Sequence, residues 1–353
     1  MPQKCVAVAM SGGVDSSVAA AILKEQCYHV IGVSMLLNHD EDDEEIENAR
    51  QVAERLAIPH HTVDFRQFFK QKVITPFCDE YRRGRTPNPC VVCNHYVKLD
   101  ALLKKVVEMG ADFMATGHYV HIELCGNIYR LFKGVDHNKD QSYFLYTLKQ
   151  EQLRRLMFPL GRLYKSQIKR MAREMGFNDF LKKESQDVCF IPGNDHHSFI
   201  SQKVPSTPGD IVDLDGNVLG KHKGLSHYTI GQRQGLGLSA DSRLYVIRID
   251  FTNNLLVAGT QEQLFVSQLS ASQLNWISGK PPQDLAGITA RIRYKAAESN
   301  IGTYIDNGTA YIKFAQPQQS AAPGQSIVFY RKDEMLGGGI IEETFQEEEG
   351  EQD

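Results

Sequence analysis

The sequence of 353 residues contains no run of about 18 consecutive apolar residues, the length that a membrane-spanning helix needs. It also shows no signal peptide, because the short apolar run after Lys4 leads into a glycine loop instead of a cleavage site. Seven cysteines are an odd number for a long chain without a secretion signal, which argues against a framework of disulfide bonds. We therefore expect a cytoplasmic protein with free thiols and no membrane partner.

The chain as a whole has no excess of positive charge: 39 Lys and Arg stand against 43 Asp and Glu, and the formal net charge is −4. The acidic residues are unevenly distributed, however: residues 40–47 hold seven of them and residues 346–353 hold five, with no Lys or Arg in either segment. The rest of the chain then carries a net charge of +8. We interpret the two acidic segments as solvated, and the basic remainder as suited to bind a polyanion.

Strand and helix patterns alternate through the first 120 residues. Strands are expected at Val6–Met10, Val30–Leu37, Thr62–Phe65 and Ala111–Thr116, and helices at Ser16–Gln26 and Glu44–Leu56. Such alternation predicts an α/β fold with a doubly wound parallel sheet. In sheets of this kind, ligands bind at the carboxyl ends of the strands.

The rest of the chain changes in character. A hairpin is expected at Ile122–Phe132, and helices near Lys149–Met157 and Lys165–Met175. From about residue 205, turns at Asp215-Gly216, Asn253-Asn254 and Asp306-Asn307-Gly308 separate short β-type runs. We therefore predict three domains: a catalytic domain at 1–198, a small β-rich domain at 199–275, and a β-barrel-like domain with an acidic tail at 276–353.

The segment Ala9–Ser17, with the sequence AMSGGVDSS, has neither the Gly-Lys-Ser/Thr of a Walker A loop nor the dinucleotide pattern G-x-G-x-x-G. It nevertheless has what a phosphate site requires. Two glycines allow the backbone to approach an anion, serine hydroxyls can donate hydrogen bonds, and the following helix presents its positive N-terminal end. We expect this loop to bind phosphate.

Three cysteines lie in motifs that suggest chemistry. Cys90 and Cys93 belong to Gly84–Asn94, where two prolines stiffen a turn that we expect to lead into a helix from about Asn94, and Cys189 lies in Glu184–Ile191. A cysteine at a helix N-terminus usually has a lowered pKa. The residues alone leave three alternatives open: a zinc site, which lacks a second C-x-x-C, an iron–sulfur cluster on three thiolates, or a pair of redox-active sulfurs.

These motifs resemble known families. SGGVDSS resembles the pyrophosphate loop of the N-type ATP pyrophosphatases, also called adenine nucleotide alpha hydrolase-like proteins. GRTPNPxxxCN and SQDVCF resemble the bacterial and mitochondrial tRNA-specific 2-thiouridylases, and the resemblance runs from residue 4 to about 340. Four further motifs share it: Ala115–Tyr119, Lys139–Leu145, Tyr228–Arg233 and Arg291–Tyr294.

The resemblance implies a mechanism. ATP adenylates O2 of the wobble uridine in the lysine, glutamate and glutamine tRNAs, and pyrophosphate is released. A persulfide on Cys189 then delivers sulfur to C2, AMP leaves, and Cys93 acts as the nucleophile that forms a disulfide with Cys189. A persulfide-donating relay protein or a cysteine desulfurase must reload Cys189, and a thiol reductant must reopen the disulfide.

The resemblance also implies site residues. The nucleotide-binding residues would be Ala9, Met10, Ser11, Gly12, Gly13, Val14, Asp15, Ser16, Met35 and Gly117, with Asp15 as a Mg²⁺ ligand by analogy. The tRNA-binding residues would be Asn88, Pro89, Cys90, His118, Lys139, Asp140, Gln141, Arg293, Tyr294 and Gln325.

One departure concerns Cys90, because many family members have aspartate at this position. The change removes a candidate acid or base and supplies the third thiol that an iron–sulfur cluster would need.

The sequence leaves two alternative functions open: a small-molecule ligase or amidotransferase on the same fold, and a non-catalytic RNA-binding protein with a relic nucleotide site.

A stretch with seven basic residues, Arg162–Lys183, is either a solvated helix face or a phosphate-binding one.

Overall fold

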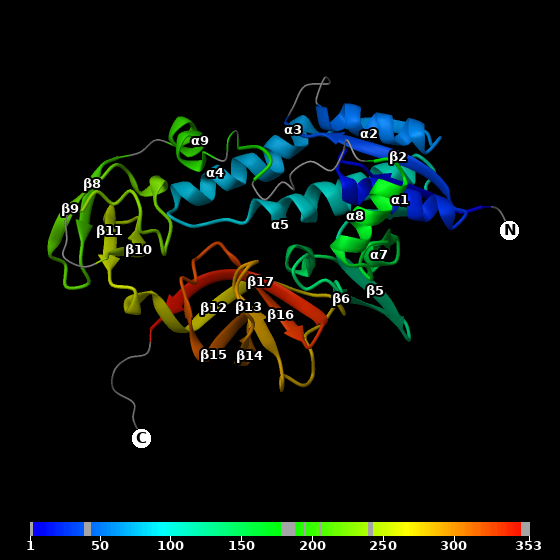
Figure 1. The fold of residues 1–353 in the computed structure, drawn as a ribbon. Coiled ribbons are helices and arrows are strands. Elements are labelled where there is room, and N and C mark those ends of the chain that lie inside the picture. Colours follow the sequence, from blue (N-terminus) through cyan, green and yellow to red (C-terminus); the bar gives the residue numbers. More distant parts are fainter. Residues whose placement is uncertain are drawn as a thin grey trace.

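The computed structural model describes residues 3–38, 44–177, 188–191, 193, 195–204, 207–238 and 243–346. The acidic residues 40–43 and 347–353, and most of the motif before Cys189, lie outside these residues. Figure 1 shows an N-terminal α/β domain, a small sheet domain at one end, and a barrel packed below both. No helix among the described residues is long and apolar enough to cross a membrane.

A parallel five-stranded sheet organises the N-terminal domain, in the order β3-β2-β1-β4-β7. Its strands are β1 (Cys5–Ala9), β2 (His29–Leu36), β3 (His60–Asp64), β4 (Phe113–Ala115) and β7 (Leu156–Met157). Neighbouring residues of β1 face opposite layers, since Val6 and Val8 belong to one hydrophobic cluster and Ala7 to the other. The sheet is therefore buried on both faces.

Helices cover both faces, as the doubly wound fold requires. One face carries α1 (Val14–Glu25), α2 (Glu44–Arg55) and α8 (Lys165–Glu174), and the other carries η2 (Asn94–Ala101) and α6 (Leu102–Glu108). The chain builds β2 and β3 on one side of β1 and then returns to place β4 on the other side. The strand order thus reverses between β1 and β4, which is where such sheets form a ligand crevice.

Two helical stretches complete this domain, of which the first had no predicted element and the second differs from its prediction. The first comprises α3 (Arg66–Phe69), η1 (Lys70–Ile74) and α4 (Thr75–Arg82), and the second comprises α5 (Pro89–Cys93), η2 and α6. Both η1 and η2 are π-helical, with hydrogen bonds between residues five apart. The expected start near Asn94 was wrong. The helix begins at Pro89, because Oδ1 of Asn88 accepts a hydrogen bond from Val91 N at 3.3 Å and proline suits the first helical position.

The helix predicted at Lys149–Met157 was also wrong in its second half. Only α7 (Gln150–Leu153) is helical, and Leu156–Met157 pairs with β4 as the edge of the parallel sheet. The predicted helix at Lys165–Met175 is confirmed as α8 to within one residue.

The predicted hairpin is confirmed as β5 (Val120–Cys125) and β6 (Ile128–Lys133), but it belongs to two domains at once. β6 pairs with β17, with Leu131 opposite Met335, so the hairpin extends a sheet of the C-terminal barrel. The barrel strands are β12 (Phe265–Trp276), β13 (Thr289–Arg291), β14 (Ser299–Asp306), β15 (Thr309–Gln319), β16 (Ser326–Arg331) and β17 (Glu334–Phe345). β12 pairs with both β15 and β17, which closes the barrel.

The domain boundary expected at residue 275 falls inside β12, so the barrel begins at Phe265. The small domain before it has the sheet order β10-β11-β8-β9. Its elements are α9 (His196–Lys203), β8 (Gly209–Val212), β9 (Val218–His222), β10 (Tyr245–Asp250) and β11 (Leu255–Gly259). The predicted turns separate β8 from β9, β10 from β11, and β14 from β15. The expected architecture, a doubly wound sheet followed by two β domains, is confirmed.

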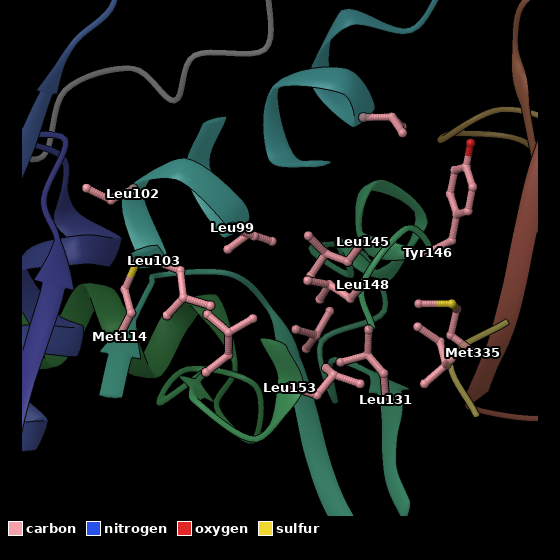
Figure 2. Packing of buried hydrophobic residues seen from close by; sticks show 14 of the residues in the cluster. Leu99, Leu102, Leu103, Met114, Leu131, Leu145, Tyr146, Leu148, Leu153 and Met335 are labelled. Carbon is pink, nitrogen blue, oxygen red and sulfur yellow. The ribbon is translucent and has the colours of Figure 1, made fainter. Parts of the chain in front are cut away.

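One hydrophobic cluster joins the α/β domain to the barrel. It includes Leu99 and Met114 on the sheet side, Leu145 in the connecting segment, and Met335 of β17. Figure 2 shows these side chains in one continuous layer, with Leu131 beside Met335. The two domains therefore share a core.

A buried ion cluster strengthens the same junction. Asp140, which is 3% exposed, accepts hydrogen bonds from Ser142 and lies 3.3 Å from the guanidinium of Arg291. The other side of Arg291 lies 2.8 Å from Glu298, which also pairs with buried Lys133 at 2.6 Å. Asp140 and Lys133 come from the α/β domain, and Arg291 and Glu298 from the barrel segment, so the cluster joins the two domains electrostatically.

Replacing Asp140 with alanine should therefore lower the free energy of unfolding by about 3 kcal/mol, because a buried guanidinium loses one of its two carboxylates. Urea unfolding followed by circular dichroism measures the effect. Glu47→Ala is the control, since it breaks a pair with Arg50 that is about half exposed, and should cost less than about 1 kcal/mol. Unchanged stability in Asp140→Ala, together with weakened RNA binding, would contradict the structural role.

Candidate active site

The phosphate loop joins β1 to α1 at the carboxyl edge of the sheet. Its shape is held by its own hydroxyls: Oγ of Ser16 and Oγ of Ser17 both donate to the carbonyl oxygen of Gly13, at 3.0 and 2.9 Å. Gly12 has a φ of +66°, and a Cβ there would lie 2.2 Å from the carbonyl oxygen of Glu45 at the start of α2. Only glycine fits at this position, so the loop needs Gly12 for its close contact with α2.

Gly117, which follows β4, packs directly on the loop. A Cβ at Gly117 would lie 3.0 Å from the backbone atoms of Asp15 and Ser16. Met35 lies near the end of β2, and its neighbour Ser34 donates through Oγ to the carbonyl oxygen of Met10 at 2.8 Å. The structure thus brings the predicted nucleotide-binding residues of three strands together at the reversal point.

Asp15 has partners that the sequence did not reveal. Its carboxylate accepts from Nζ of Lys165 at 2.7 and 2.8 Å and from the hydroxyl of Tyr119 at 2.6 Å. Lys165 is only 8% exposed, although it lies in the basic stretch interpreted as a solvated or phosphate-binding face. Lys165 therefore places a buried positive charge beside Asp15 of the loop.

The carboxylate of Asp15 has an acceptor position that a Mg²⁺ ion could use. Three of its roughly four acceptor positions are occupied by Lys165 and Tyr119. One remaining position suits Mg²⁺, which commonly takes one or two carboxylates together with substrate phosphates. Asp15 therefore fits as a single protein ligand to a phosphate-bound ion.

The three cysteines singled out from the sequence lie in different surroundings. Cys90 and Cys93 are both in α5, where Cys90 is exposed and Cys93 is buried. Exposed Cys189 is held by its neighbour Phe190, which packs edge-on against Phe69 and Phe77 with ring centroids 5.7 and 5.4 Å away. Among the residues described, no group of His, Cys, Asp or Glu is arranged to hold a metal ion.

Lys98 connects these thiols, and sequence reasoning missed it. It lies in η2 five residues after Cys93, which in a π-helix is about one turn. Burial lowers the pKa of the Lys98 ammonium, but negative charge on Cys93, Cys189 and Cys90, together with that of Glu45, outweighs burial and raises that pKa. Loss of hydration raises the pKa of each thiol, including Cys90 and Cys189, which are partly enclosed by the protein although each residue is exposed overall, and Lys98 opposes that rise. The single ammonium of Lys98 therefore favours the thiolate form of all three cysteines.

The expectation of a thiol with a lowered pKa was wrong for Cys93. Burial raises the pKa of Cys93 to about 12, and Lys98 only partly offsets this. The cause is position: Cys93 ends α5 and continues into η2, so its sulfur lies in the hydrophobic layer with Val97 and Phe190 and not at a free helix N-terminus. The positive charge of Lys98 thus favours the Cys93 thiolate, against the larger effect of burial.

Four of the residues predicted to bind tRNA lie around one cavity of about 400 Å³. They are Asn88, Pro89, Cys90 and Gln325. Gln325 of the barrel donates through Nε2 to the carbonyl oxygen of Thr86 at 3.0 Å, and Arg85 pairs with Glu342 at 2.6 Å. The barrel therefore holds the loop that leads into α5.

Two further predicted residues, His118 and Gln141, lie in or beside the segment that follows β4. His118 follows Gly117, and its Nδ1 lies 2.7 Å from Oγ1 of Thr116. Burial, reinforced by Lys98, lowers the pKa of His118 to about 3, so the imidazole is neutral at pH 7. Oε1 of Gln141 accepts from the backbone N–H of Tyr119 at 3.1 Å. His118 thus links the phosphate loop to the thiols.

The remaining residues predicted to contact tRNA differ in how exposed they are. Arg293 is exposed, Lys139 is half-buried, and Tyr294 packs on Phe144 with ring centroids 4.5 Å apart. Asp140 was a wrong prediction as a tRNA contact, because its carboxylate is buried and satisfied by Ser142 and Arg291.

Comparison with known proteins identifies the family to which the chain is related. A family described as "tRNA methyl transferase HUP domain" matches residues 4–193, a "tRNA methyl transferase PRC-barrel domain" matches 197–260, and an "Aminomethyltransferase beta-barrel domain" matches 266–341. The chain is similar to the tRNA-specific 2-thiouridylase MnmA of Dehalococcoides mccartyi, at 46% identity over 96% of each chain. It is also similar to that of Clostridium acetobutylicum, at 45% identity over 96% of this chain and 99% of the other.

Among solved structures, the U34-tRNA thiolase NcsA from Methanococcus maripaludis with its [4Fe-4S] cluster matches at 20% identity and a TM-score of 0.37, over 57% of this chain and 64% of the other. A likeness of this strength establishes neither a function nor a cofactor for the present chain.

Replacing Lys98 with methionine should slow the alkylation of Cys189 by iodoacetamide at pH 8 about tenfold or more, because losing a nearby positive charge raises the thiol pKa further. Mass spectrometry of the alkylated peptide over a pH series gives the rate. Lys98→Arg keeps the charge and should stay within about twofold of the wild type. Equal rates in Lys98→Met and wild type would show that Lys98 does not stabilise the thiolate.

Proposed function

The chain belongs to the tRNA-specific 2-thiouridylase family, and we propose that it adenylates O2 of the wobble uridine with ATP and replaces that oxygen with sulfur carried on Cys189. The substrates would be the lysine, glutamate and glutamine tRNAs. The observation that supports this most directly is that two adjacent residues, Gly117 and His118, connect the phosphate loop with the group of thiols. Gly117 packs on Asp15 and Ser16 of the phosphate loop, and the next residue, His118, is electrostatically coupled to Lys98 among the thiols.

In the first step, O2 of the uridine attacks the α phosphate of ATP and pyrophosphate leaves. Lys165 is placed to neutralise the phosphates, and the loop N–H groups and the N-terminal end of α1 favour the same negative charge. Tyr119 fixes the orientation of Asp15 through its hydroxyl. A Mg²⁺ ion bound to Asp15 and the phosphates would polarise the reacting phosphoryl group.

In the second step, the terminal sulfur of the Cys189 persulfide attacks C2 and AMP departs, leaving a Cys189–S–S–C2 linkage. The Cys93 thiolate then attacks the sulfur of Cys189. The S–S bond breaks, its electron pair stays on the sulfur bound to C2, and a Cys93–Cys189 disulfide forms. An external dithiol reductant must reopen this disulfide, and an external persulfide donor must reload Cys189. The buried site of Cys93 suits an internal nucleophile that should not react with other thiols.

The thiols also bear on the cluster alternative. An iron–sulfur cluster on Cys90, Cys93 and Cys189 would require three thiolates. Among the residues that the structure describes, no group of three or more His, Cys, Asp or Glu side chains is arranged to hold a metal ion. We therefore favour persulfide chemistry over a cluster.

Replacing Asp15 with asparagine should reduce tRNA-dependent pyrophosphate release by at least about 100-fold, because the charged partner of Lys165 is lost inside a phosphate site. Filter binding should show nearly unchanged affinity for tRNA. Tyr119→Phe removes only one hydrogen bond to the same carboxylate, so its loss should be clearly smaller. A fully active Asp15→Asn enzyme would refute the assigned role.

Serine variants of the two catalytic cysteines should block the reaction at different steps. Cys189→Ser should not thiolate tRNA with any persulfide donor, whereas Cys93→Ser should still load a persulfide on Cys189 but not complete the transfer. Nucleoside analysis of the tRNA and mass spectrometry of the protein separate the two failures. Stoichiometric iron and acid-labile sulfide in an active enzyme, combined with inactivity of Cys90→Ser, would favour the cluster instead.

A further inference from the structure

A cavity of about 400 Å³ lies where all three domains meet, and one thiol opens into it. Cys90 forms part of its wall, together with His196 of α9, His227 of the small domain and Gln325 of the barrel. Tyr81 of α4 lines it as well and shares a hydrogen bond with Thr229, which joins the first and second domains across the cavity. Its volume is in the range of sites that hold small molecules.

The other two thiols are placed differently. Cys93 is 7% exposed and does not line the cavity. Cys189 is not part of the wall either, although the preceding residue, Val188, is. Cys90 is thus the one thiol of the three through which a molecule in this cavity could enter the sulfur chemistry.

Cys90 is also held firmly. Its carbonyl oxygen accepts from Nδ2 of Asn94 at 3.0 Å, and the helix that carries it is capped by Asn88. Oδ1 of Asn94 has no hydrogen-bond partner within the described part of the chain, although the residue is only 5% exposed. The segment that presents Cys90 therefore ends in a buried acceptor that could receive an S–H or N–H group.

We propose that Cys90 is a sulfur relay: it accepts a sulfane sulfur from a persulfide R–S–SH that enters the cavity, and passes it to Cys189. The proposal rests on the proposed function of Cys189 as the persulfide carrier. It gives a role to the thiol that replaces the aspartate of many relatives.

The chemistry balances as two exchanges. The Cys90 thiolate attacks the outer sulfur of R–S–SH, which forms Cys90–S–SH and releases R–S⁻. The Cys189 thiolate then attacks the outer sulfur of Cys90–S–SH, which forms Cys189–S–SH and restores the Cys90 thiolate. No net oxidant or reductant is consumed, because the sulfane sulfur keeps its oxidation state throughout.

Electrostatics support the second exchange. Burial raises the pKa of Cys90 and of Cys189, and Lys98 partly offsets the rise for both, so the attacking and the leaving thiolate are stabilised by the same ammonium. Exchange between thiols in matched surroundings has no large thermodynamic bias. Sulfur can therefore pass to Cys189 once its persulfide is consumed.

The test separates loading from transfer. Wild type, Cys90→Ser and Cys90→Ala are treated with glutathione persulfide, and the rate at which Cys189 gains one sulfur atom is followed by mass spectrometry. We expect a fall of at least about tenfold in both variants. A short peptide with one persulfidated cysteine is used in parallel, and a larger fall with the peptide would indicate a protein-borne donor over a free small persulfide.

Two further measurements complete the test. In a Cys93→Ser/Cys189→Ser variant, persulfide should accumulate on Cys90 well above the level on exposed Cys125, which serves as the internal control for non-specific reaction. Wild-type enzyme that is preloaded at Cys189 should thiolate tRNA in a single turnover without added persulfide, which tests the Cys189 step apart from loading. Wild-type loading in Cys90→Ala, or no persulfide on Cys90 above that on Cys125, would overturn the relay. Failure of preloaded wild-type enzyme to thiolate tRNA would instead refute the proposed function.

Discussion

The ammonium of Lys98 is the charge on which the arrangement of the active site depends. Taking sulfur out of water disfavours the thiolate that sulfur chemistry requires, and burial at Cys93 is nearly complete. The π-helical turn after Cys93 brings Lys98 to the same side of the helix, where it opposes that cost for three thiols. Burial, reinforced by the same charge, lowers the pKa of His118 to about 3, so this residue beside the phosphate loop is neutral at pH 7. The site therefore combines burial, which excludes water, with a single compensating cation.

Much of this could be predicted from the sequence, and the reasons are local. The strands of the parallel sheet are short apolar runs, and the glycine–serine loop follows the first of them, so both were identified to within a few residues. The helix from Pro89 was placed too late, because its proline was interpreted as part of a turn and not as its first residue. Lys98 could not be recognised until that helix and its π-helical turn were known.

Contacts between residues far apart in the chain could not be predicted from the sequence. Lys165 lies 150 residues from Asp15, and nothing in the composition of its basic stretch distinguishes this buried lysine from its solvated neighbours. Asp140 belongs to a motif shared with a family that binds RNA, yet the fold uses its carboxylate to join the hairpin segment to the barrel. A sequence motif shared within a family can therefore contain residues that hold the domains together as well as residues that contact the substrate.

The pairing of β6 with β17 has a consequence for how the chain is made. Residues opposite one another in this pair are about 200 positions apart, so at ribosomal rates of about 5–20 residues per second the hairpin waits roughly 10–40 seconds for its partner strand. During that time its edge is open to pairing with another nascent chain. The polar and charged residues that alternate along the hairpin, such as Glu123 and Arg130, would keep that open edge soluble until translation reaches the barrel.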